Sequence, residues 1–246
     1  MLRQFFKENP KLALAFSGGV DSAYLLYAAK AFGADVKAYY VKTPFQPEFE
    51  QVDAVRLAAQ LDAEMVTLRL DVLSDSSITE NPKNRCYFCK KRIFNAILEQ
   101  AKADGYSLII DGTNASDDAA DRPGMVALKE LAVRSPLREA GLTKEEIRRL
   151  SKEAGLFTHD KPAYACLATR IPTGSPITAE KLAVTERNEG FLRSLGFADF
   201  RIRFLGTAAK LQVSEAELPL LLTHRETIFQ RLKNDYAEVL LDLEVR

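Results

Sequence analysis

Residues 12–22 read Leu-Ala-Leu-Ala-Phe-Ser-Gly-Gly-Val-Asp-Ser, and this stretch decides the fold. Its first five residues form a short apolar run typical of a buried strand, and a helical pattern follows over residues 22–32. Between them, two consecutive glycines let the backbone approach an anion, and the free N–H groups of a following helix point at that anion. The stretch therefore predicts a phosphate-binding turn between a strand and a helix.

The same alternation of strand and helix continues outward through the first two thirds of the chain. Further strands are expected at residues 36–41, 64–70 and 108–111, and further helices at residues 47–61 and 84–103. This order predicts an α/β fold with a doubly wound parallel sheet and helices on both of its faces. Ligands of such sheets bind at the carboxyl ends of the strands, where the glycine-rich turn lies.

The pattern changes after residues 161–176, which are rich in proline and glycine. Before them, Thr143 and Glu146 form a capping box that opens a helix ending at Gly155. After them, a small α+β unit is expected: helix 179–195, strands 200–205 and 209–213, helix 215–234 and strand 237–245. Ser214 and Glu217 read as a second capping box. We therefore divide the chain into a nucleotide-binding domain, residues 1–174, and a small α+β domain, residues 175–246.

Composition narrows the range of partners. The 246 residues contain 34 Lys and Arg and 34 Asp and Glu, so the formal net charge is zero and no basic field attracts nucleic acid. No apolar run has the length of a signal peptide or a membrane span, which predicts a cytoplasmic protein without a membrane partner. Small molecules or other proteins are the expected partners. The small C-terminal unit favours contacts between subunits and thus a homo-oligomer.

The glycine-rich turn has a definite chemistry. Ser17 and Ser22 add hydroxyl donors to the backbone of Gly18 and Gly19, and Asp21 is placed to hold a Mg²⁺ that bridges phosphate oxygens. The turn lacks the lysine that ends a Walker A loop, so transfer of the γ-phosphoryl group is not indicated. The alternative is an ordinary Gly-Gly turn between a strand and a helix that binds no ligand.

The motif Ser-Gly-Gly-x-Asp-Ser resembles the pyrophosphate loop, or PP loop, of the N-type ATP pyrophosphatases. That superfamily cleaves ATP between the α- and β-phosphates, adenylates an oxygen of its substrate and lets a nitrogen or sulfur nucleophile displace AMP. A second polar loop, residues 111–118, follows the strand expected at residues 108–111. Thr113 and Asn114 are candidates there for binding ATP, although a merely solvated loop is the alternative.

Three cysteines are too few for a disulfide framework in a chain of this length. Cys86 and Cys89 are spaced to share one face of a helix, and Cys166 lies in the irregular segment. Three thiolates suit a [4Fe–4S] cluster with one iron left open. A structural zinc with His159 as fourth ligand and plain burial of the helical pair remain alternatives. Arg170, close after Cys166, is a candidate for bidentate binding of a phosphate or carboxylate.

Taken together, these stretches resemble the ATP-dependent sulfurtransferases that build the nickel-pincer nucleotide cofactor, the LarE family. The resemblance covers nearly the whole chain, and Cys166-Leu-Ala-Thr-Arg170 is its narrowest motif. The other matching stretches are residues 17–22, 84–90, 111–114 with Asp117 and Asp118, 122–124, 134–137, 139–144, 161–162, 201–203 and 240–244.

The resemblance implies an adenine nucleotide alpha hydrolase-like fold, called PP-loop, and a nucleotide as substrate. A carboxylate of pyridinium-3,5-biscarboxylic acid mononucleotide attacks the α-phosphate of ATP, pyrophosphate leaves, and sulfur then replaces AMP to give a thiocarboxylate. Ser17, Asp21 and Cys166 would be catalytic. Arg170, Arg201 and Arg203 would hold the substrate phosphate, and Glu189 is a candidate metal ligand.

The resemblance also implies two possible sources of sulfur. Members with three cysteines carry a transferable sulfide on a cluster, which here would use Cys86, Cys89 and Cys166. Members with the linker cysteine alone give up its sulfur and keep dehydroalanine, so sacrificial use of Cys166 is the alternative. The sequence names no external sulfur donor. The rival functions are a PP-loop thiolase acting on tRNA or a nucleobase, an ammonia-using ligase, and a non-catalytic nucleotide or metal carrier.

Overall fold

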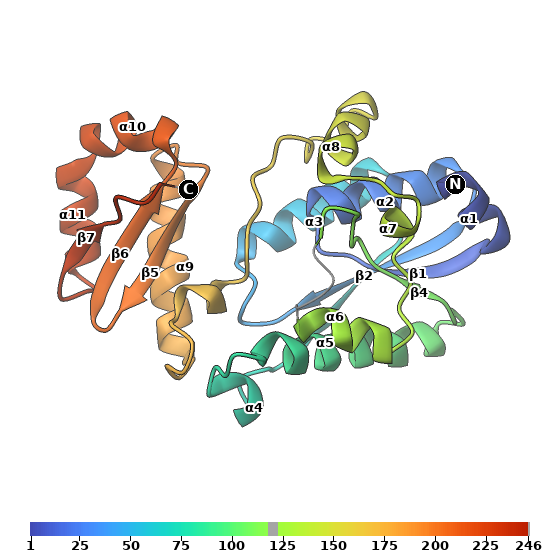
Figure 1. Cartoon of the computed structure of the whole chain (residues 1–246), viewed down its shortest axis with the longest axis horizontal. Coiled ribbons are helices and arrows are strands. Elements are labelled where there is room, and N and C mark those ends of the chain that lie inside the picture. The colour runs from blue at the N-terminus through green and yellow to red at the C-terminus, as the bar shows by residue number, and fades with distance from the viewer. Residues whose placement is uncertain (118–122, 246) are drawn as a thin grey trace. The chain divides into compact units, whose positions relative to one another are not determined.

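The computed structural model describes residues 1–117 and 123–245, and these form two compact units (Figure 1). The first unit comprises Met1–Val72 and Asn84–Lys161, and the second comprises Leu73–Lys83 and Pro162–Arg246. The boundary expected after residue 174 lies inside the second unit. Nothing in the sequence pattern indicated that residues 73–83 leave the first unit and join the second.

Residues 162–174 belong to the second unit because their backbone is bonded to residues 73–83. The side-chain amide of Asn81, which lies within residues 73–83, donates to the carbonyls of Ile171 and Pro172 at 3.2 and 2.8 Å. The backbone N–H of Gly174 donates to the carbonyl of Asn81 at 2.8 Å. Residues 162–174 are thus tied to the piece that the chain contributes from residues 73–83.

The first unit is built on a four-stranded parallel sheet, as predicted. The strands lie in the order β3-β2-β1-β4, and every pairing is parallel. Their bounds are β1 (Lys11–Ala15), β2 (Asp35–Lys42), β3 (Met65–Arg69) and β4 (Ile109–Ile110). β1 is an inner strand, so both of its faces are covered, and after the exposed Lys11 its residues are apolar without alternation.

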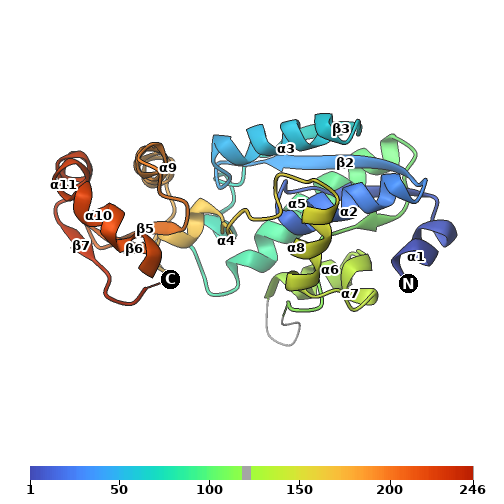
Figure 2. The ribbon, with the colours of Figure 1, turned by 90° about the horizontal axis from the view of Figure 1, so that it is seen from above.

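Helices cover both faces of this sheet (Figures 1 and 2). Leu12 and Leu14 of β1 pack toward one layer, whereas Ala13 packs toward the other. The first layer contains α2 (Val20–Ala31), α3 (Glu48–Gln60), α8 (Lys144–Glu153) and the short helices α1 (Leu2–Glu8) and α7 (Pro136–Glu139). The second contains α5 (Arg85–Ala103) and α6 (Pro123–Glu130). The doubly wound architecture is therefore confirmed.

Two of the predicted loops meet because β1 and β4 are parallel neighbours. The PP loop follows β1 and residues 111–117 follow β4, so both leave the same edge of the sheet. Gly112 marks the contact, since a Cβ placed there would lie 2.9 Å from the backbone nitrogen of Ser22. Glycine is required at this position for the second loop to lie against the start of α2.

The second unit has a mixed three-stranded sheet in the order β5-β6-β7. β5 (Phe200–Leu205) and β6 (Ala208–Val213) are antiparallel, and β7 (Val239–Leu241) is parallel to β6. The helical elements are α4 (Ser76–Thr79), η1 (Leu167–Arg170), α9 (Ala179–Ser194), η2 (Glu215–Glu217), α10 (Leu218–Thr223) and α11 (Arg225–Lys233). The core of this unit is formed where α9 and α11 pack on β5 and β6.

The expected helix over residues 215–234 is wrong, because the structure forms η2, α10 and α11 in its place. The capping box expected from Ser214 and Glu217 is also absent. The Glu217 carboxylate instead accepts the backbone N–H groups of Ala198 and Asp199, at 2.6 and 3.1 Å, and the Ser214 hydroxyl at 3.0 Å. Its oxygens thus serve the turn that leads into β5. The box at Thr143 and Glu146, by contrast, has both of its bonds.

In the described part of the chain, no helix combines the length and the apolar character needed to cross a membrane.

The close approach at Gly112 predicts that Gly112→Ala destabilises the first unit. The added methyl group meets backbone rather than a flexible side chain, so we expect the free energy of unfolding to fall by about 1–3 kcal/mol in urea titrations. Gly190→Ala in α9 is the control, since nothing lies within 4 Å of its Cβ position. That helix should gain up to about 1 kcal/mol. Equal stability of Gly112→Ala and wild type would show that the loop need not touch α2.

Candidate functional site

The PP loop is organised by its own hydroxyl groups. Ser17 Oγ and Ser22 Oγ lie 3.1 Å apart, Ser22 Oγ donates to the carbonyl of Gly19 at 3.2 Å, and the N–H of Gly19 donates to Ser17 Oγ at 3.3 Å. Gly18 has a φ of +73°, and a Cβ there would lie 3.0 Å from Cβ of Ala54. The loop therefore needs glycine for both conformation and space.

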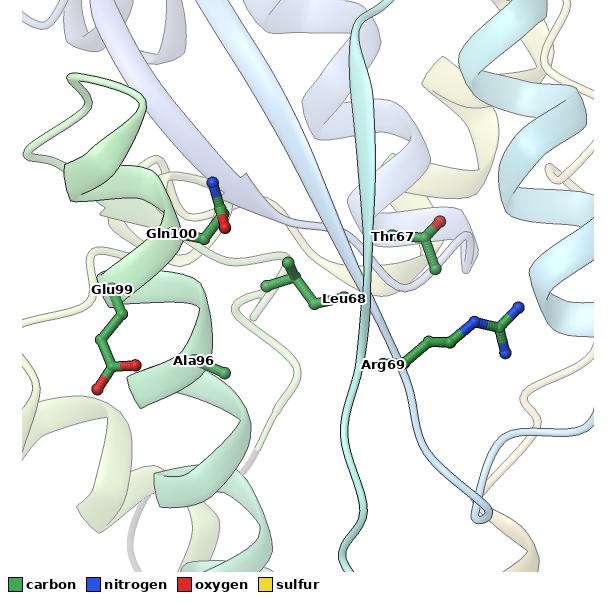
Figure 3. Close-up of a pocket in the computed structure, with 6 residues that line it drawn as sticks. All are labelled: Thr67, Leu68, Arg69, Ala96, Glu99 and Gln100. Atoms are coloured by element: carbon green, nitrogen blue, oxygen red, sulfur yellow. The ribbon is translucent and has the colours of Figure 1, made fainter.

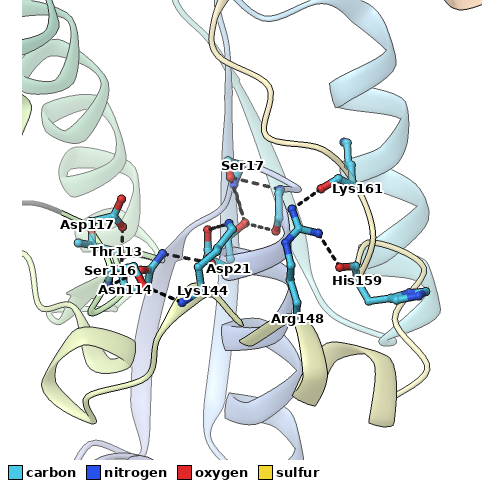
Figure 4. A network of polar contacts seen from close by, with 12 residues as sticks. Ser17, Asp21, Thr113, Asn114, Ser116, Asp117, Lys144, Arg148, His159 and Lys161 are labelled. Atoms are coloured by element: carbon cyan, nitrogen blue, oxygen red, sulfur yellow. Dashed lines mark hydrogen bonds and ion pairs between the residues drawn. The ribbon is translucent and has the colours of Figure 1, made fainter. Parts of the chain in front are cut away.

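Asp21 is the charged centre of the loop (Figure 4). Its Oδ2 lies 2.5 Å from Nζ of Lys144, and its Oδ1 accepts the side-chain amide of Asn114 at 3.3 Å. Asn114 comes from the loop after β4, whereas Lys144 is the first residue of α8. The expected proximity of the two loops is thus realised through side chains. The sequence reasoning did not single out Lys144, although a cation at a helix N-terminus is a signal because the helix dipole disfavours it.

The second loop is held by Asp111, which is buried. Its carboxylate accepts the backbone N–H and the hydroxyl of Thr113, at 3.2 and 2.6 Å, and the hydroxyl of Ser135 at 2.7 Å. The Thr113 hydroxyl, expected to bind ATP, therefore donates within its own loop. The backbone N–H of Asn114 donates to Asp117 at 3.0 Å. Asp118 and Arg122, which belong to the matching stretches, lie outside the described residues.

The last residues of the first unit are attached to α8 by their backbone. Arg148 donates from Nη1 to the carbonyl of His159 and from Nη2 to the carbonyl of Lys161, both at 2.7 Å (Figure 4). The ammonium of Lys161 lies 2.7 Å from Oδ2 of Asp53 in α3. The position from which the chain leaves the first unit is therefore fixed by two carbonyls and one ion pair.

The cysteines are divided between the units, and none of the three forms a disulfide. Cys86 is exposed and Cys89 half-buried in the first turn of α5, whereas Cys166 precedes η1 in the second unit. Within the described residues of either unit, no three His, Cys, Asp or Glu side chains are grouped to hold a metal ion. His159, weighed as a zinc ligand, has Nδ1 3.0 Å from the carbonyl of Leu156.

The turn that contains the CxxC motif packs on α6 through a polar triad. The hydroxyl of Tyr87, between the two cysteines, donates to Oε2 of Glu130 at 2.8 Å. Lys91 bonds both groups at 3.0 Å. Hydrogen bonds from Tyr87 and Lys91 hold the pKa of Glu130 below its usual value. The triad fixes the orientation of the helical turn and leaves the Cys86 side on the surface.

Arg170 and Glu189 are each other's partners, which differs from the roles expected for them. Arg170 is 0% and Glu189 2% exposed, with Nε–Oε1 and Nη2–Oε2 distances of 2.7 and 3.0 Å. The remaining bonds to Glu189 come from the hydroxyl of Tyr164 at 2.6 Å and the N–H of Ile202 at 3.0 Å. Because both carboxylate oxygens are occupied, the pair acts as a positioning device in this structure. The roles expected for Arg170 in binding phosphate and for Glu189 in binding a metal stay predictions.

The positioning device acts on the segment around Cys166. Nη1 of Arg170 donates to the carbonyl of Ala165 at 3.0 Å and to the hydroxyl of Thr169 at 2.8 Å, and that hydroxyl donates to the carbonyl of Cys166 at 2.8 Å. Burial lowers the pKa of Arg170, but the hydrogen bond and charge of Glu189 outweigh it, so the pKa stays above its ordinary value. The guanidinium therefore remains charged in the core.

The other two arginines expected to bind the substrate phosphate lie on β5. Arg201 is buried and donates to the carbonyls of Phe200 and Ala163, both at 2.9 Å. Arg203 is half-buried on the same strand. The guanidinium carbons of Arg170 and Arg201 lie 4.6 and 5.5 Å from the ring centre of Tyr164. Positive charge is thus concentrated in the second unit, close in sequence and structure to the residues that precede Cys166.

A pocket lies apart from these groups, between the edge strand β3 and the middle of α5 (Figure 3). It is lined by Thr67, Leu68, Arg69, Ala96, Glu99 and Gln100. None of these residues belongs to the PP loop or to the cysteine motifs.

Sequence comparisons identify relatives over most of the chain, although no model of a protein family matches it. The pyridinium-3,5-bisthiocarboxylic acid mononucleotide synthase of Lactiplantibacillus plantarum is 32% identical over 240 residues, which are 96% of this chain and 87% of that protein. The chain belongs to this synthase's family, the LarE family. An uncharacterized protein of Synechocystis is 37% identical over 218 residues, 88% of this chain and 81% of that protein.

The chain also has a more distant relative outside the LarE family. The tRNA-specific 2-thiouridylase of Pseudothermotoga lettingae is 28% identical over 188 residues, 61% of this chain and 54% of that enzyme. The LarE family and these thiouridylases are ATP-dependent sulfurtransferases with a PP loop. This LarE-family chain is accordingly an ATP-dependent sulfurtransferase, and the resemblance drawn from its motifs is confirmed.

The buried pair in this LarE-family chain predicts a large effect of Arg170→Met on stability. The substitution leaves the Glu189 carboxylate buried without its counterion, so we expect the free energy of unfolding to fall by about 3–5 kcal/mol, measured by urea titration. Arg149→Met, which removes an exposed pair with Glu153, should cost at most about 1 kcal/mol.

Arg170→Met combined with Glu189→Gln removes the unpaired charge and should recover part of the loss. If the double variant is instead no more stable than Arg170→Met alone, the pair is not the source of the effect.

Proposed function

We propose that this chain thiolates pyridinium-3,5-biscarboxylic acid mononucleotide in the synthesis of the nickel-pincer cofactor. The substrate follows from the name of the synthase of Lactiplantibacillus plantarum, whose product is the bisthiocarboxylic acid. The observation that carries the chemistry is the PP loop, preformed at the carboxyl edge of a parallel sheet with Asp21 at its centre. Such a loop binds the phosphates of a nucleotide.

In the first half-reaction, a substrate carboxylate oxygen attacks the α-phosphorus of ATP. The bond from that phosphorus to the oxygen bridging the α- and β-phosphates breaks, and its electrons leave with pyrophosphate. The backbone N–H groups around Gly18 and Gly19 and the hydroxyls of Ser17 and Ser22 stabilise the growing negative charge. In the second half-reaction, a sulfur nucleophile attacks the acyl carbon, and the bond to AMP breaks.

Asp21 and Asn114 fit a Mg²⁺ site, because carboxylate and amide oxygens are the ligands that this ion prefers. Both side chains converge on the PP loop, where Asn114 already bonds Asp21. A magnesium ion there would offset the charge of the phosphates. Asn114 would then turn its oxygen toward the ion, while Thr113 keeps the loop in shape through Asp111.

The cysteines fit an iron–sulfur cluster in number and chemical state, since three thiols outside any disulfide supply the ligands that a cluster with one open iron requires. Cys86 and Cys89 lie on one turn of α5, and Cys166 precedes η1. A bound cluster would supply a transferable sulfide on its open iron. Within the first unit, Tyr87 and Lys91 would orient the helical turn that carries Cys86 and Cys89. Within the second unit, Arg170 and Thr169 would orient the backbone beside Cys166.

Sacrificial transfer from Cys166 is the alternative within the same function. A base would take the Cα proton, the Cβ–Sγ bond would break, and dehydroalanine would remain in the chain while the sulfur leaves on the product. The well-held backbone of residues 165–170 suits either source of sulfur, because both need Cys166 at a fixed place. The mass of the chain after turnover separates them.

The second unit is assigned to the substrate and to contacts between subunits. Its arginines around Tyr164, with Arg203 on β5, provide positive charge for the mononucleotide phosphate. We expect a homo-oligomer in the cytoplasm, where thiols stay reduced. A tRNA thiolase is the second candidate because of the thiouridylase relative, but that match spans less of both chains than the synthase match.

Asp21→Asn should abolish adenylation. Without the carboxylate, the phosphates lose their metal-binding group, and we expect release of pyrophosphate in the presence of the dicarboxylate nucleotide to fall on the order of 100-fold or more. Asp62→Asn is the matched control, because Asp62 is exposed and its φ of 46° suits asparagine. Pyrophosphate release at the wild-type rate by Asp21→Asn would mean that the loop binds no catalytic metal through this residue.

Iron and acid-labile sulfide, measured after anaerobic reconstitution, test the source of sulfur. Wild type should hold about four irons per chain, and Cys86→Ala should lose them. Ser107→Ala, a change of similar size at an exposed position of the same unit, should retain them. If wild type holds no iron, and the chain after turnover has lost the mass of hydrogen sulfide at Cys166, the sacrificial route is the correct one.

A further inference from the structure

The hydroxyl of Tyr164 reaches the buried ion pair from the turn that leads to Cys166. It donates at 2.6 Å to Oε2 of Glu189, the oxygen that also accepts Nη2 of Arg170 at 3.0 Å. Glu189 is 2% exposed, whereas Tyr164 is half-buried, so the bond ties a side chain of the turn to the interior of the second unit. Hydrogen bonds to charged groups are stronger than those between neutral groups. The bond therefore restrains the chain two residues before Cys166.

The ring of Tyr164 lies among three guanidinium groups. Their central carbons are 4.6, 5.5 and 5.6 Å from the ring centre in Arg170, Arg201 and Arg193, respectively. The three arginines belong to η1, β5 and α9. The face of an aromatic ring attracts a cation, whereas cations that approach one another repel. The ring thus joins three separate elements of the unit around the turn.

Two of these arginines also hold the backbone on either side of Tyr164. Arg201 donates to the carbonyl of the preceding residue at 2.9 Å, and Arg170 donates to the carbonyl of the following residue at 3.0 Å. A movement of the ring would therefore displace both guanidinium groups and, through them, the two peptide groups that flank Tyr164. The second of these peptide groups leads directly into Cys166, so the displacement would reach the thiol.

Packing alone does not require the hydroxyl of Tyr164. Phenylalanine has the same ring, would fill the same space and would keep the contacts with the guanidinium groups. The hydroxyl adds a direction, because it orients the ring toward one oxygen of Glu189, which is itself fixed by Arg170 and the N–H of Ile202. Tyrosine at this position therefore favours a role in orienting the turn.

We propose that Tyr164 is a positioning residue for sulfur transfer, which fixes the turn before Cys166 through its hydroxyl and its ring. The inference rests on the proposed function, since it takes Cys166 as the residue that delivers sulfur. The PP loop lies in the first unit, whereas every contact that carries the inference lies in the second. Tyr164 therefore acts on the second half-reaction and not on adenylation.

Amide hydrogen exchange, resolved by peptide mass spectrometry, tests the positioning role without a substrate. Tyr164→Phe keeps the ring and removes the bond to Glu189, so the amides of residues 167–171 should exchange about tenfold faster than in wild type. The amides of β6 should exchange at the wild-type rate. No change at residues 167–171 would overturn the proposal. Equal acceleration in β6 would overturn it too, because Tyr164 would then stabilise the whole unit.

Tyr106→Phe is the matched control for the loss of a hydroxyl. The hydroxyl of Tyr106 also donates to a carboxylate, that of Asp35 at 2.9 Å, but both residues belong to the first unit. Residues 167–171 should therefore exchange in this variant as they do in wild type. Faster exchange there in both variants would show that the effect does not depend on Tyr164, and the proposal would be wrong.

A double-mutant cycle with Arg193 tests the role of the ring. Tyr164→Leu removes the ring as well as the hydroxyl and should accelerate exchange at residues 167–171 more than Tyr164→Phe does. Arg193→Met alone loses a contact with the ring and should also accelerate exchange. In the chain with Tyr164→Leu, Arg193→Met should give no further acceleration, because that contact is already absent. Equal effects of Arg193→Met in the two chains would refute the role of the ring.

A single turnover separates this inference from the proposed function. Wild type, reconstituted with iron and sulfide, is given ATP and the dicarboxylate nucleotide, and the thiocarboxylate is measured by mass spectrometry. Tyr164→Phe should form it about tenfold more slowly, while the release of pyrophosphate changes much less. If both steps are slowed equally, or neither is, the role in sulfur transfer is wrong. If wild type itself forms no thiocarboxylate, the proposed function is wrong, and the role of Tyr164 in sulfur transfer falls with it.

Discussion

The parallel pairing of β1 with β4 is the constraint on which the rest of the first unit depends. It sends the two loops that follow these strands to the same edge of the sheet, although they are about 90 residues apart. Gly112 then lets the second loop lie directly against the backbone of Ser22. Neither loop has the necessary groups alone: one supplies N–H donors and a carboxylate, and the other supplies the amide that holds this carboxylate.

In the second unit, a network of buried polar groups holds the backbone beside Cys166 in place. Burying a guanidinium costs free energy of folding unless the group is paired with a counterion and its N–H groups are hydrogen-bonded. Here one carboxylate, one carbonyl and two hydroxyls surround Arg170 and Glu189, and the network ends on the backbone beside Cys166. Such a network favours one fixed conformation of the backbone beside Cys166, which suits the sulfur-carrying role proposed for this residue.

Much of the fold and the family were predictable from local pattern. Apolar runs and glycine turns gave the parallel strands, and the Ser-Gly-Gly-x-Asp-Ser and Cys-Leu-Ala-Thr-Arg motifs gave the family. Pairing over long distances was not predictable. The sequence shows Asp21 and Lys144, but not that they meet across 123 positions, nor that Arg170 and Glu189 satisfy each other in a core. Likewise, Glu217 followed the capping pattern, and only the fold shows that Ala198 and Asp199 take its oxygens.

The attachment of residues 159–161 to Arg148 has a consequence for how this protein diverges. Both bonds go to carbonyl oxygens, and every amino acid has a carbonyl oxygen. Natural substitutions at positions 159 and 161 therefore leave the anchor intact, whereas position 148 tolerates few replacements because it needs a forked donor. Among homologues, the two backbone bonds are expected to constrain the arginine and not the side chains of its partners, so the only constraint on the side chain at position 161 comes from its separate ion pair with Asp53.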